Sequence, residues 1–293
     1  MDALLVVNPF ASAVTEERAA QVEDVLRRGG PVETLWTERR GHATEIARGA
    51  GWSLRAVYVF SGDGGFNEVL NGVDGTVPLG FIPGGGASVL PRGLGLPRDP
   101  VAAAERLLSG RTRRISLGRV NGRRFGFAAG LGFDAELVRR VDALGRKPGG
   151  GRPSDLRFAL TALGMLREGR GRIDESLELV GLGRAAFALV ANGDPYTYAG
   201  GLPLHVAPEA RFELGLDVVA PRSLTPAKLP RFLLYAALGR GQTTSKDVIY
   251  AHDLDELEAV CDRPTALQVD GEDLGDVREV VLEAERDAVV VLV

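Results

Sequence analysis

The sequence predicts a fold in two parts: a doubly wound, Rossmann-like α/β domain, then a β-rich, sandwich-like domain. A chain of 293 residues is long enough for two separate hydrophobic cores. Residues 1–118 alternate short β-branched runs with segments of helical period. The later residues hold many short strand-like runs separated by glycine or proline. We therefore expect domains at 1–118 and 119–293, with the boundary near Gly118.

Four apolar runs in the first domain are expected to form strands buried on both faces, as in a parallel sheet. They are Ala3–Val7, Val32–Trp36, Ala56–Phe60 and Leu79–Ile82. Helices are predicted between them, at Thr15–Arg28 and His42–Ala50. Thr15 is the expected N-cap of the first helix, and Gly29-Gly30 ends it.

The second domain is expected to be mainly antiparallel, because its strand-like runs are short and closely spaced. The predicted strands are Arg123–Ala129, Leu177–Val180, Ala186–Ala191, Leu216–Ala220, Lys246–Tyr250, Ala266–Val269, Val277–Leu282 and Val289–Val293. Helices are predicted only at about Asp134–Leu144, Asp155–Arg167 and Pro226–Leu238.

Charge and composition narrow the classes of function. The net charge of −4 gives no reason to expect nucleic-acid binding. The single cysteine, Cys261, excludes an internal disulfide, and three scattered histidines argue against a zinc site. Asp2 stands where a signal peptide carries a base, and no apolar run approaches about 18 residues. We expect a cytoplasmic protein that contacts a membrane only peripherally, at its inner surface.

One segment of this acidic protein is basic. Residues 139–172 hold nine Arg or Lys against three acids, and Gly149–Gly151 lies within them. The segment is either a solvated surface loop, mobile at its glycines, or a site for anionic phosphates.

Three glycine-rich or turn-forming loops follow predicted strands of the first domain, at the sheet edge where open α/β sheets bind ligands. They are Val7–Ala13, Phe60–Gly72, which turns through glycines into a short helix, and Ile82–Val89, each given with the last residue of its strand. Glycines let a backbone approach phosphate closely, and helix N-termini offer free N–H groups. None of the three is a Walker loop or fits Gly-x-Gly-x-x-Gly, so each alone is equally explained as a turn.

The ordered motifs resemble the diacylglycerol kinase catalytic-domain family of bacterial lipid kinases, which is related to the sphingosine and ceramide kinases. The residues that carry the resemblance are Val7-Asn8-Pro9, Ser61-Gly62-Asp63-Gly64 with Asn67-Glu68-Val69 and Asn71-Gly72, Ile82-Pro83-Gly84-Gly85, Phe125 to Ala135, Asn192-Gly193, Gly200-Gly201, Pro208 and Gln268-Val269-Asp270-Gly271-Glu272. The resemblance implies a nucleotide-binding α/β domain with an NAD-kinase-like fold, followed by a β-rich lipid-acceptor domain. It also implies transfer of the γ-phosphate of ATP to the hydroxyl of diacylglycerol or a related neutral lipid, with Mg²⁺.

The resemblance also assigns site residues. The nucleotide would be lined by Asn8, Thr37, Gly62, Asp63, Gly64, Gly65, Glu68, Gly84, Gly85 and Gly86. Asp63 would hold Mg²⁺ or the transferring phosphate, and Glu272 or Asp270 would be the general base, with Glu272 preferred. Glu213 and Asp217 lie where the family carries acids linked to a structural Mg²⁺, although Glu213 departs from the usual Asp-Gly form.

Several of these residues have a simpler explanation. Asp63 and Thr37 suit helix caps, and Glu68 suits a first helical turn. Asp270-Gly271 is a favoured hairpin turn. The family commonly has Thr at position 65 and Gly-Thr/Ser-x-Asn in the third loop, where this chain has Gly65 and Gly85-Gly86-Ala87-Ser88. At these positions, this chain therefore lacks, or has in shorter form, the hydroxyl or amide side chains that would donate hydrogen bonds to phosphate.

Two other functions remain open: a non-catalytic regulator of the same fold that binds lipid or nucleotide, and an NAD-kinase-like enzyme. The apolar stretch Pro226–Leu238, flanked by Lys228, Arg231 and Arg240, suits either a bilayer interface or a core-packed amphipathic helix. A homodimer is compatible with the sequence, which shows no interface signature.

Overall fold

The computed structural model describes residues 3–50, 53–144, 155–168 and 171–293, which form two compact units. Unit 1 consists of the residues up to Leu117 together with Arg286–Val293. Unit 2 consists of the described residues between Gly118 and Glu285. The sequence-based division assigned residues 286–293 to the second domain, whereas they complete the sheet of unit 1.

Unit 1 contains a parallel sheet in the order β16-β4-β3-β1-β2. Its strands are β1 (Ala3–Val7), β2 (Val32–Trp36), β3 (Ala56–Ser61), β4 (Leu79–Pro83) and the end of β16 (Glu272–Leu292). Every residue of β1, β3 and β4 is buried, as predicted. In β2 only Val32 is buried, so the prediction that this strand is covered on both faces is wrong. It lies at the edge of the sheet, where neighbouring elements cover less of it.

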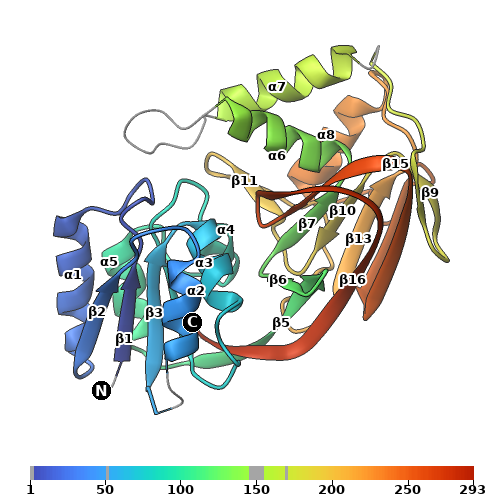
Figure 1. Ribbon diagram of the computed structural model, residues 1–293. Helices are drawn as coiled ribbons and strands as arrows, with labels where there is room; N and C mark the ends of the chain where they lie inside the picture. The colour runs from blue at the N-terminus through green and yellow to red at the C-terminus, as the bar shows by residue number, and fades with distance from the viewer. Residues whose placement is uncertain (1–2, 51–52, 145–154, 169–170) are drawn as a thin grey trace. The chain divides into compact units, whose positions relative to one another are not determined.

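Helices cover both faces of this sheet, as expected for a doubly wound fold (Figure 1). They are α1 (Glu16–Arg27), α2 (His42–Gly49), α3 (Asp63–Leu70), α4 (Val89–Gly93) and α5 (Pro100–Leu107). Leu26 of α1 and Leu107 of α5 share one hydrophobic core with Leu5 of β1. On the opposite face, Phe66 of α3 packs edge-on against Phe81 of β4, with ring centroids 5.3 Å apart.

Unit 2 is antiparallel, as predicted, with the strand order β14-β13-β10-β7-β15-β16. Its strands are β6 (Arg123–Phe125), β7 (Ala128–Leu131), β8 (Leu177–Leu179), β9 (Gly183–Ala185), β10 (Ala188–Ala191), β11 (Thr197–Ala199), β12 (Leu202–Leu204), β13 (Leu216–Pro221), β14 (Val248–Leu254), β15 (Glu256–Val269) and the start of β16; β5 (Thr112–Val120) runs from unit 1 into unit 2.

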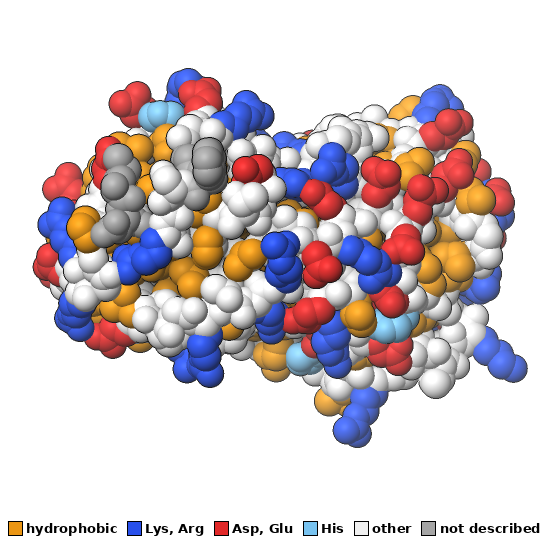
Figure 2. Space-filling model, turned by 90° about the horizontal axis from the view of Figure 1, so that it is seen from below, with side chains coloured by type: hydrophobic (Ala, Val, Ile, Leu, Met, Phe, Trp, Pro, Cys, Tyr) orange, Lys and Arg blue, Asp and Glu red, His pale blue; other side chains and the backbone are white. Residues whose placement is uncertain are grey.

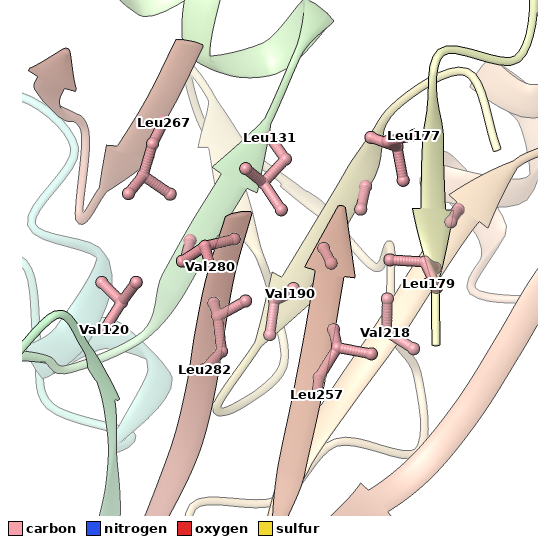
Figure 3. Packing of buried hydrophobic residues seen from close by; sticks show 14 of the residues in the cluster. Val120, Leu131, Leu177, Leu179, Val190, Val218, Leu257, Leu267, Val280 and Leu282 are labelled. Carbon is pink, nitrogen blue, oxygen red and sulfur yellow. The ribbon is translucent and has the colours of Figure 1, made fainter. Parts of the chain in front are cut away.

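A hydrophobic core lies between two layers of strands in unit 2 (Figure 3). The first half of β15 pairs with β8 and its second half pairs with β7. The register of β15 on β16 shifts between Val260 and Thr265, where the hairpin passes from one layer to the other. Leu177 and Leu179 of β8 therefore pack in the same core as Val190 of β10 and Val218 of β13.

Unit 2 has three helices among its described residues: α6 (Phe133–Ala143), α7 (Asp155–Glu168) and α8 (Leu229–Leu238). Helix α8 begins later than predicted, after a turn in which the N–H groups of Lys228 and Leu229 donate to the Thr225 carbonyl. In the described part of the chain, no helix is both long and apolar enough to cross a bilayer.

The basic segment is largely neutralised where the structure describes it. Arg139 pairs with Asp273 and Asp276, and Arg140 pairs with Glu136 and Glu168. The predicted mobile loop at Gly149–Gly151 lies outside the described residues. On the face that Figure 2 shows, acidic and basic side chains are intermixed.

Candidate functional site

The three loops predicted from the sequence follow β1, β3 and β4, which are adjacent parallel strands of unit 1. We call residues 8–13, 61–65 and 83–88 the first, second and third loops. The Ala13 N–H donates to the Gly84 carbonyl at 2.9 Å, and the Gly84 N–H donates to the Ser61 carbonyl at 2.7 Å. The loops therefore meet at one edge of the sheet, where their backbones are hydrogen-bonded together.

Two glycines allow the second and third loops to touch. A Cβ atom on Gly85 would lie 2.8 Å from the Gly62 Cα, and one on Gly62 would lie 3.3 Å from the Gly85 Cα. A Cβ atom on Gly84 would meet Val14 at 2.7 Å. These glycines are needed for loop packing, whatever further contact they make with a ligand.

Two acids from the sequence motif connect separate parts of this edge. Asp63 begins α3, and its Oδ1 accepts the Val89 N–H of α4 at 2.7 Å, so it caps a neighbouring helix. Glu68 accepts the Gly41 N–H at 2.8 Å and the Ala43 N–H at 3.2 Å, at the start of α2. Both carboxylates fix the positions of the loops around them.

Asn8, Ser61 and Thr37 form a polar cluster where β1, β2 and β3 end. The Asn8 amide nitrogen donates to Ser61 Oγ at 3.0 Å, and Thr37 Oγ1 lies 3.5 Å from Asn8 Oδ1. Thr37 is buried and is not a helix cap, because α2 has Gly41 at its N-cap.

Sequence reasoning missed a cationic cavity beside the third loop. The cavity has a volume of about 190 Å³ and is lined by Arg18, Arg92 and Arg98 together with Gly85 and Gly86. No residue that lines it is acidic. Its guanidinium groups attract anions. Arg92 and Arg98 follow the third loop closely in sequence, and this proximity could have indicated positive charge beside the loop.

In unit 2, the two candidate bases, Asp270 and Glu272, have different surroundings. Asp270 is 5% exposed, and its carboxylate accepts the N–H groups of Gly126, Phe127 and Ala128 at 2.6, 3.0 and 3.1 Å. Glu272 is partly exposed and pairs with the Arg123 guanidinium. The Asp270 carboxylate therefore anchors the backbone between β6 and β7.

Asp134, which sequence reasoning quoted only as part of a motif, has the surroundings of a functional carboxyl group. Its Oδ2 accepts the Tyr196 hydroxyl at 2.9 Å and the Gln268 amide at 2.7 Å. Burial raises its pKa above the usual range, although these hydrogen bonds oppose the rise. A Cβ atom on Gly130 would lie 2.2 Å from this oxygen, so Gly130 makes room for it. Perturbed carboxyl groups of this kind often mark functional sites.

At the second predicted metal site, the Asp217 carboxylate is hydrogen-bonded to protein groups. Asp217 is fully buried, and its carboxylate accepts the Tyr250 hydroxyl and the Asp253 N–H at 2.8 and 3.1 Å. His252 Nδ1 lies 2.8 Å from the same carboxylate. In the described part of the chain, no three potential metal-ligating side chains lie together. Protein donors therefore contact the Asp217 carboxylate where a cation was expected, and the assignment of Glu213 and Asp217 as metal ligands stays a prediction.

The predicted residues therefore fall into two sets. Those of unit 1 are Asn8, Thr37, Gly62, Asp63, Gly64, Gly65, Glu68, Gly84, Gly85 and Gly86, and they surround the three loops or support them. Those of unit 2 are Asp270 and Glu272, at the turn between β15 and β16, together with Asp217 of β13 and Glu213 just before that strand.

Part of the chain is similar in sequence to known lipid kinases. Residues 2–120 match the diacylglycerol kinase catalytic domain. The diacylglycerol kinase of Bacillus subtilis is 34% identical over 148 residues, which cover 47% of this chain and 48% of that protein. The Staphylococcus saprophyticus diacylglycerol kinase is 32% identical over 131 residues, 42% of each chain. These matches span about half the length of the curated relatives or less.

The fold likeness extends further than the sequence match. The crystal structure of a diacylglycerol kinase from Bacillus anthracis superposes with a TM-score of 0.74 at 18% identity, covering 99% of this chain and 96% of that one. The fold is thus shared across both units. In sequence, residues 2–120 are therefore similar to the diacylglycerol kinase catalytic domain, and the bacterial relatives match over less than half of this chain.

Proposed function

We propose that this protein is an ATP-dependent lipid kinase that phosphorylates the hydroxyl of diacylglycerol or a related neutral lipid. The observation that carries the proposal is the meeting of three loops at one edge of the unit 1 sheet, within the segment that matches a diacylglycerol kinase catalytic domain. Unit 1 would bind the nucleotide, and unit 2 would supply the base and the lipid-acceptor surface.

The features of unit 1 suit a polyphosphate. The glycines of the second and third loops expose backbone N–H groups, and the N-terminus of α3 adds the positive end of a helix dipole. Arg18, Arg92 and Arg98 add positive charge beside the third loop. Asn8 and Thr37, at the ends of β1 and β2, would contact the rest of the nucleotide.

The residues at this edge are compatible with Mg²⁺. In nucleotide enzymes Mg²⁺ is bound by one or two carboxylates together with phosphate oxygens and water. Asp63 provides such a carboxylate between the second and third loops. When bound, Mg²⁺ neutralises the charge that develops on the phosphates.

Glu272 is the proposed general base. The lipid hydroxyl oxygen would attack the γ-phosphorus, the bond between that phosphorus and the bridging oxygen of ADP would break, and the Glu272 carboxylate would take the hydroxyl proton. Asp270 is less suited to this role, because its carboxylate already accepts three backbone N–H groups. Asp270 would instead hold the turn that presents Glu272.

The acceptor can be identified by transfer of label from γ-labelled ATP. Mixed micelles would contain diacylglycerol, ceramide, sphingosine or monoacylglycerol, and a parallel reaction would contain NAD. We expect label in one lipid and none in NAD, with the signal lost in Asp63→Asn and Glu272→Gln. Nucleotide binding without label in any acceptor would favour the non-catalytic function, and label in NAD would favour an NAD-kinase-like enzyme.

An exposed apolar face of unit 2 supports peripheral membrane contact. Leu233, Leu234 and Leu238 of α8 are 61%, 54% and 60% exposed, while Leu229 and Phe232 pack on a hydrophobic cluster beneath the helix. A surface enzyme with a lipid acceptor would place such leucines at the bilayer interface. Sedimentation with anionic vesicles should decrease when Leu233 and Leu234 are replaced by serine. Equal sedimentation of the two proteins would exclude this face.

A further inference from the structure

At the start of the second loop, the Ser61 side chain fills the space that a side chain on Gly65 would need. Ser61 is the last residue of β3 and is 1% exposed. A Cβ atom on Gly65 would lie 2.0 Å from Ser61 Oγ and 2.8 Å from Ser61 Cβ. Both distances are far below van der Waals contact, so position 65 has no room for a side chain while Ser61 is present.

The backbone of Gly65 gives no other reason for a glycine. Gly65 lies in the first turn of α3 and is not one of the glycines with positive φ. In a helical conformation glycine is less stable than alanine. The space that Gly65 leaves for the Ser61 hydroxyl therefore explains the residue.

The Ser61 hydroxyl in turn fixes the side chain of Asn8. The Phe10 N–H donates to Asn8 Oδ1 at 3.0 Å, which orients the amide so that its nitrogen points the other way. That nitrogen donates to Ser61 Oγ at 3.0 Å. Asn8 is thus held at both of its polar atoms, at the edge where the three loops meet.

We propose that Ser61 is a positioning residue of the nucleotide site, acting through Asn8, and that Ser61 and Gly65 function only as a pair. The inference rests on the proposed function, since it concerns the orientation of a side chain that would contact the nucleotide. It also bears on the departure from the family pattern at Gly65, because the Ser61 hydroxyl fills the space that a side chain at position 65 would need.

The test uses four variants of the full chain: Ser61→Ala, Gly65→Thr, Ser61→Gly, and the double variant Ser61→Gly/Gly65→Thr. The Kd of a non-hydrolysable ATP analogue is measured by calorimetry, which requires no turnover, and the midpoint of thermal unfolding is measured on the same samples. Gly164→Ala is the control, because Gly164 is a helical glycine with open space around its Cβ position.

We expect Ser61→Ala to weaken binding of the analogue about fivefold, which is the loss of one net hydrogen bond. Gly65→Thr should lose binding or fail to fold, whereas the double variant should fold and bind within about threefold of the wild type, because removal of the Ser61 side chain makes room for threonine. Gly164→Ala should leave binding unchanged.

Three outcomes would overturn the inference. In the first, Ser61→Ala binds the analogue with the wild-type Kd. In the second, Gly65→Thr folds and binds the analogue like the wild type. In the third, the double variant neither binds more tightly nor unfolds at a higher temperature than Gly65→Thr alone. If the wild type binds no ATP analogue, the proposed function fails and the role of Ser61 at a nucleotide fails with it. Binding by the wild type with any of the three outcomes above overturns only the Ser61 inference.

Discussion

Asp270 and Glu272 are two residues apart, yet their surroundings give them different tasks. Asp270 has a positive φ of 48° and accepts three backbone N–H groups. Asparagine tolerates the same backbone conformation, so Asp270→Asn isolates the loss of the carboxylate. We expect this variant to lower the free energy of unfolding by about 2–4 kcal/mol, measured by urea denaturation.

Glu272→Gln is the matched control for stability. The Glu272 side chain is 20% exposed and its pairing with Arg123 lies near the surface, so its loss should cost less than about 1 kcal/mol. A wild-type urea midpoint in Asp270→Asn would contradict the anchoring role. A large loss of stability in Glu272→Gln would contradict the proposal that Glu272 acts only as the general base.

The buried carboxyl group of Asp134 predicts a dependence of stability on pH. Burial raises the pKa of this acid in the folded state, so the folded protein binds the proton more tightly than the unfolded chain. Its contribution to stability is therefore largest below about pH 4 and is lost as the pH rises through the folded-state pKa.

Asp134→Asn removes this titration. Compared with the variant, the wild type should lose unfolding free energy as the pH rises from about 4 to about 8, as measured by urea denaturation. Parallel pH profiles of the two proteins would show that Asp134 titrates normally.

At the scale of single elements, the sequence predicted best those helices and strands whose ends depend on residues close to them in the chain. The bounds of β1 and β2 follow directly from their apolar runs, and Thr15 is the N-cap of α1, its Oγ1 accepting the Arg18 N–H at 3.2 Å. Thr15→Ala should lower the free energy of unfolding by about 1 kcal/mol, whereas Thr15→Ser should retain most of it. Equal urea midpoints for all three proteins would exclude a stabilising cap.

Elements that depend on distant partners were harder to predict. The predicted strand Arg123–Ala129 is divided into β6 and β7, because Asp270 takes the N–H groups at the break. The predicted strands Val277–Leu282 and Val289–Val293 are parts of one strand, β16. The charged residues between them hid this continuity, because strand pairing uses the backbone and not the side chains.

At the scale of the whole molecule, unit 1 is completed by residues that follow unit 2 in the chain. Leu292 of β16 is 5% exposed and belongs to the unit 1 core. Leu292→Ala should lower the free energy of unfolding by about 2–4 kcal/mol and weaken nucleotide binding. Val281 lies on the same strand but is 40% exposed, so Val281→Ala should change stability by less than about 0.5 kcal/mol. Equal effects of the two substitutions, measured by urea denaturation, would contradict this assembly of unit 1.

The candidate site was predictable where it follows from strand order. Parallel neighbouring strands end at one edge, so the three loops could be placed together from sequence. For the cavity of Arg18, Arg92 and Arg98 the sequence offered only a partial signal, since Arg92 and Arg98 follow the third loop closely but Arg18 belongs to α1 and joins them only in the folded unit. The environment of Asp134 likewise requires Tyr196 and Gln268, which are distant in sequence.

The most direct test of the account is the initial rate of diacylglycerol phosphorylation by the wild type and Glu272→Gln at saturating ATP, with the Kd for ATP measured on the same samples. We expect phosphorylated diacylglycerol from the wild type, a rate lower by about 10²–10⁴-fold in the variant, and the same Kd in both. Equal rates in the two proteins, or no product from a wild type that binds ATP, would contradict it.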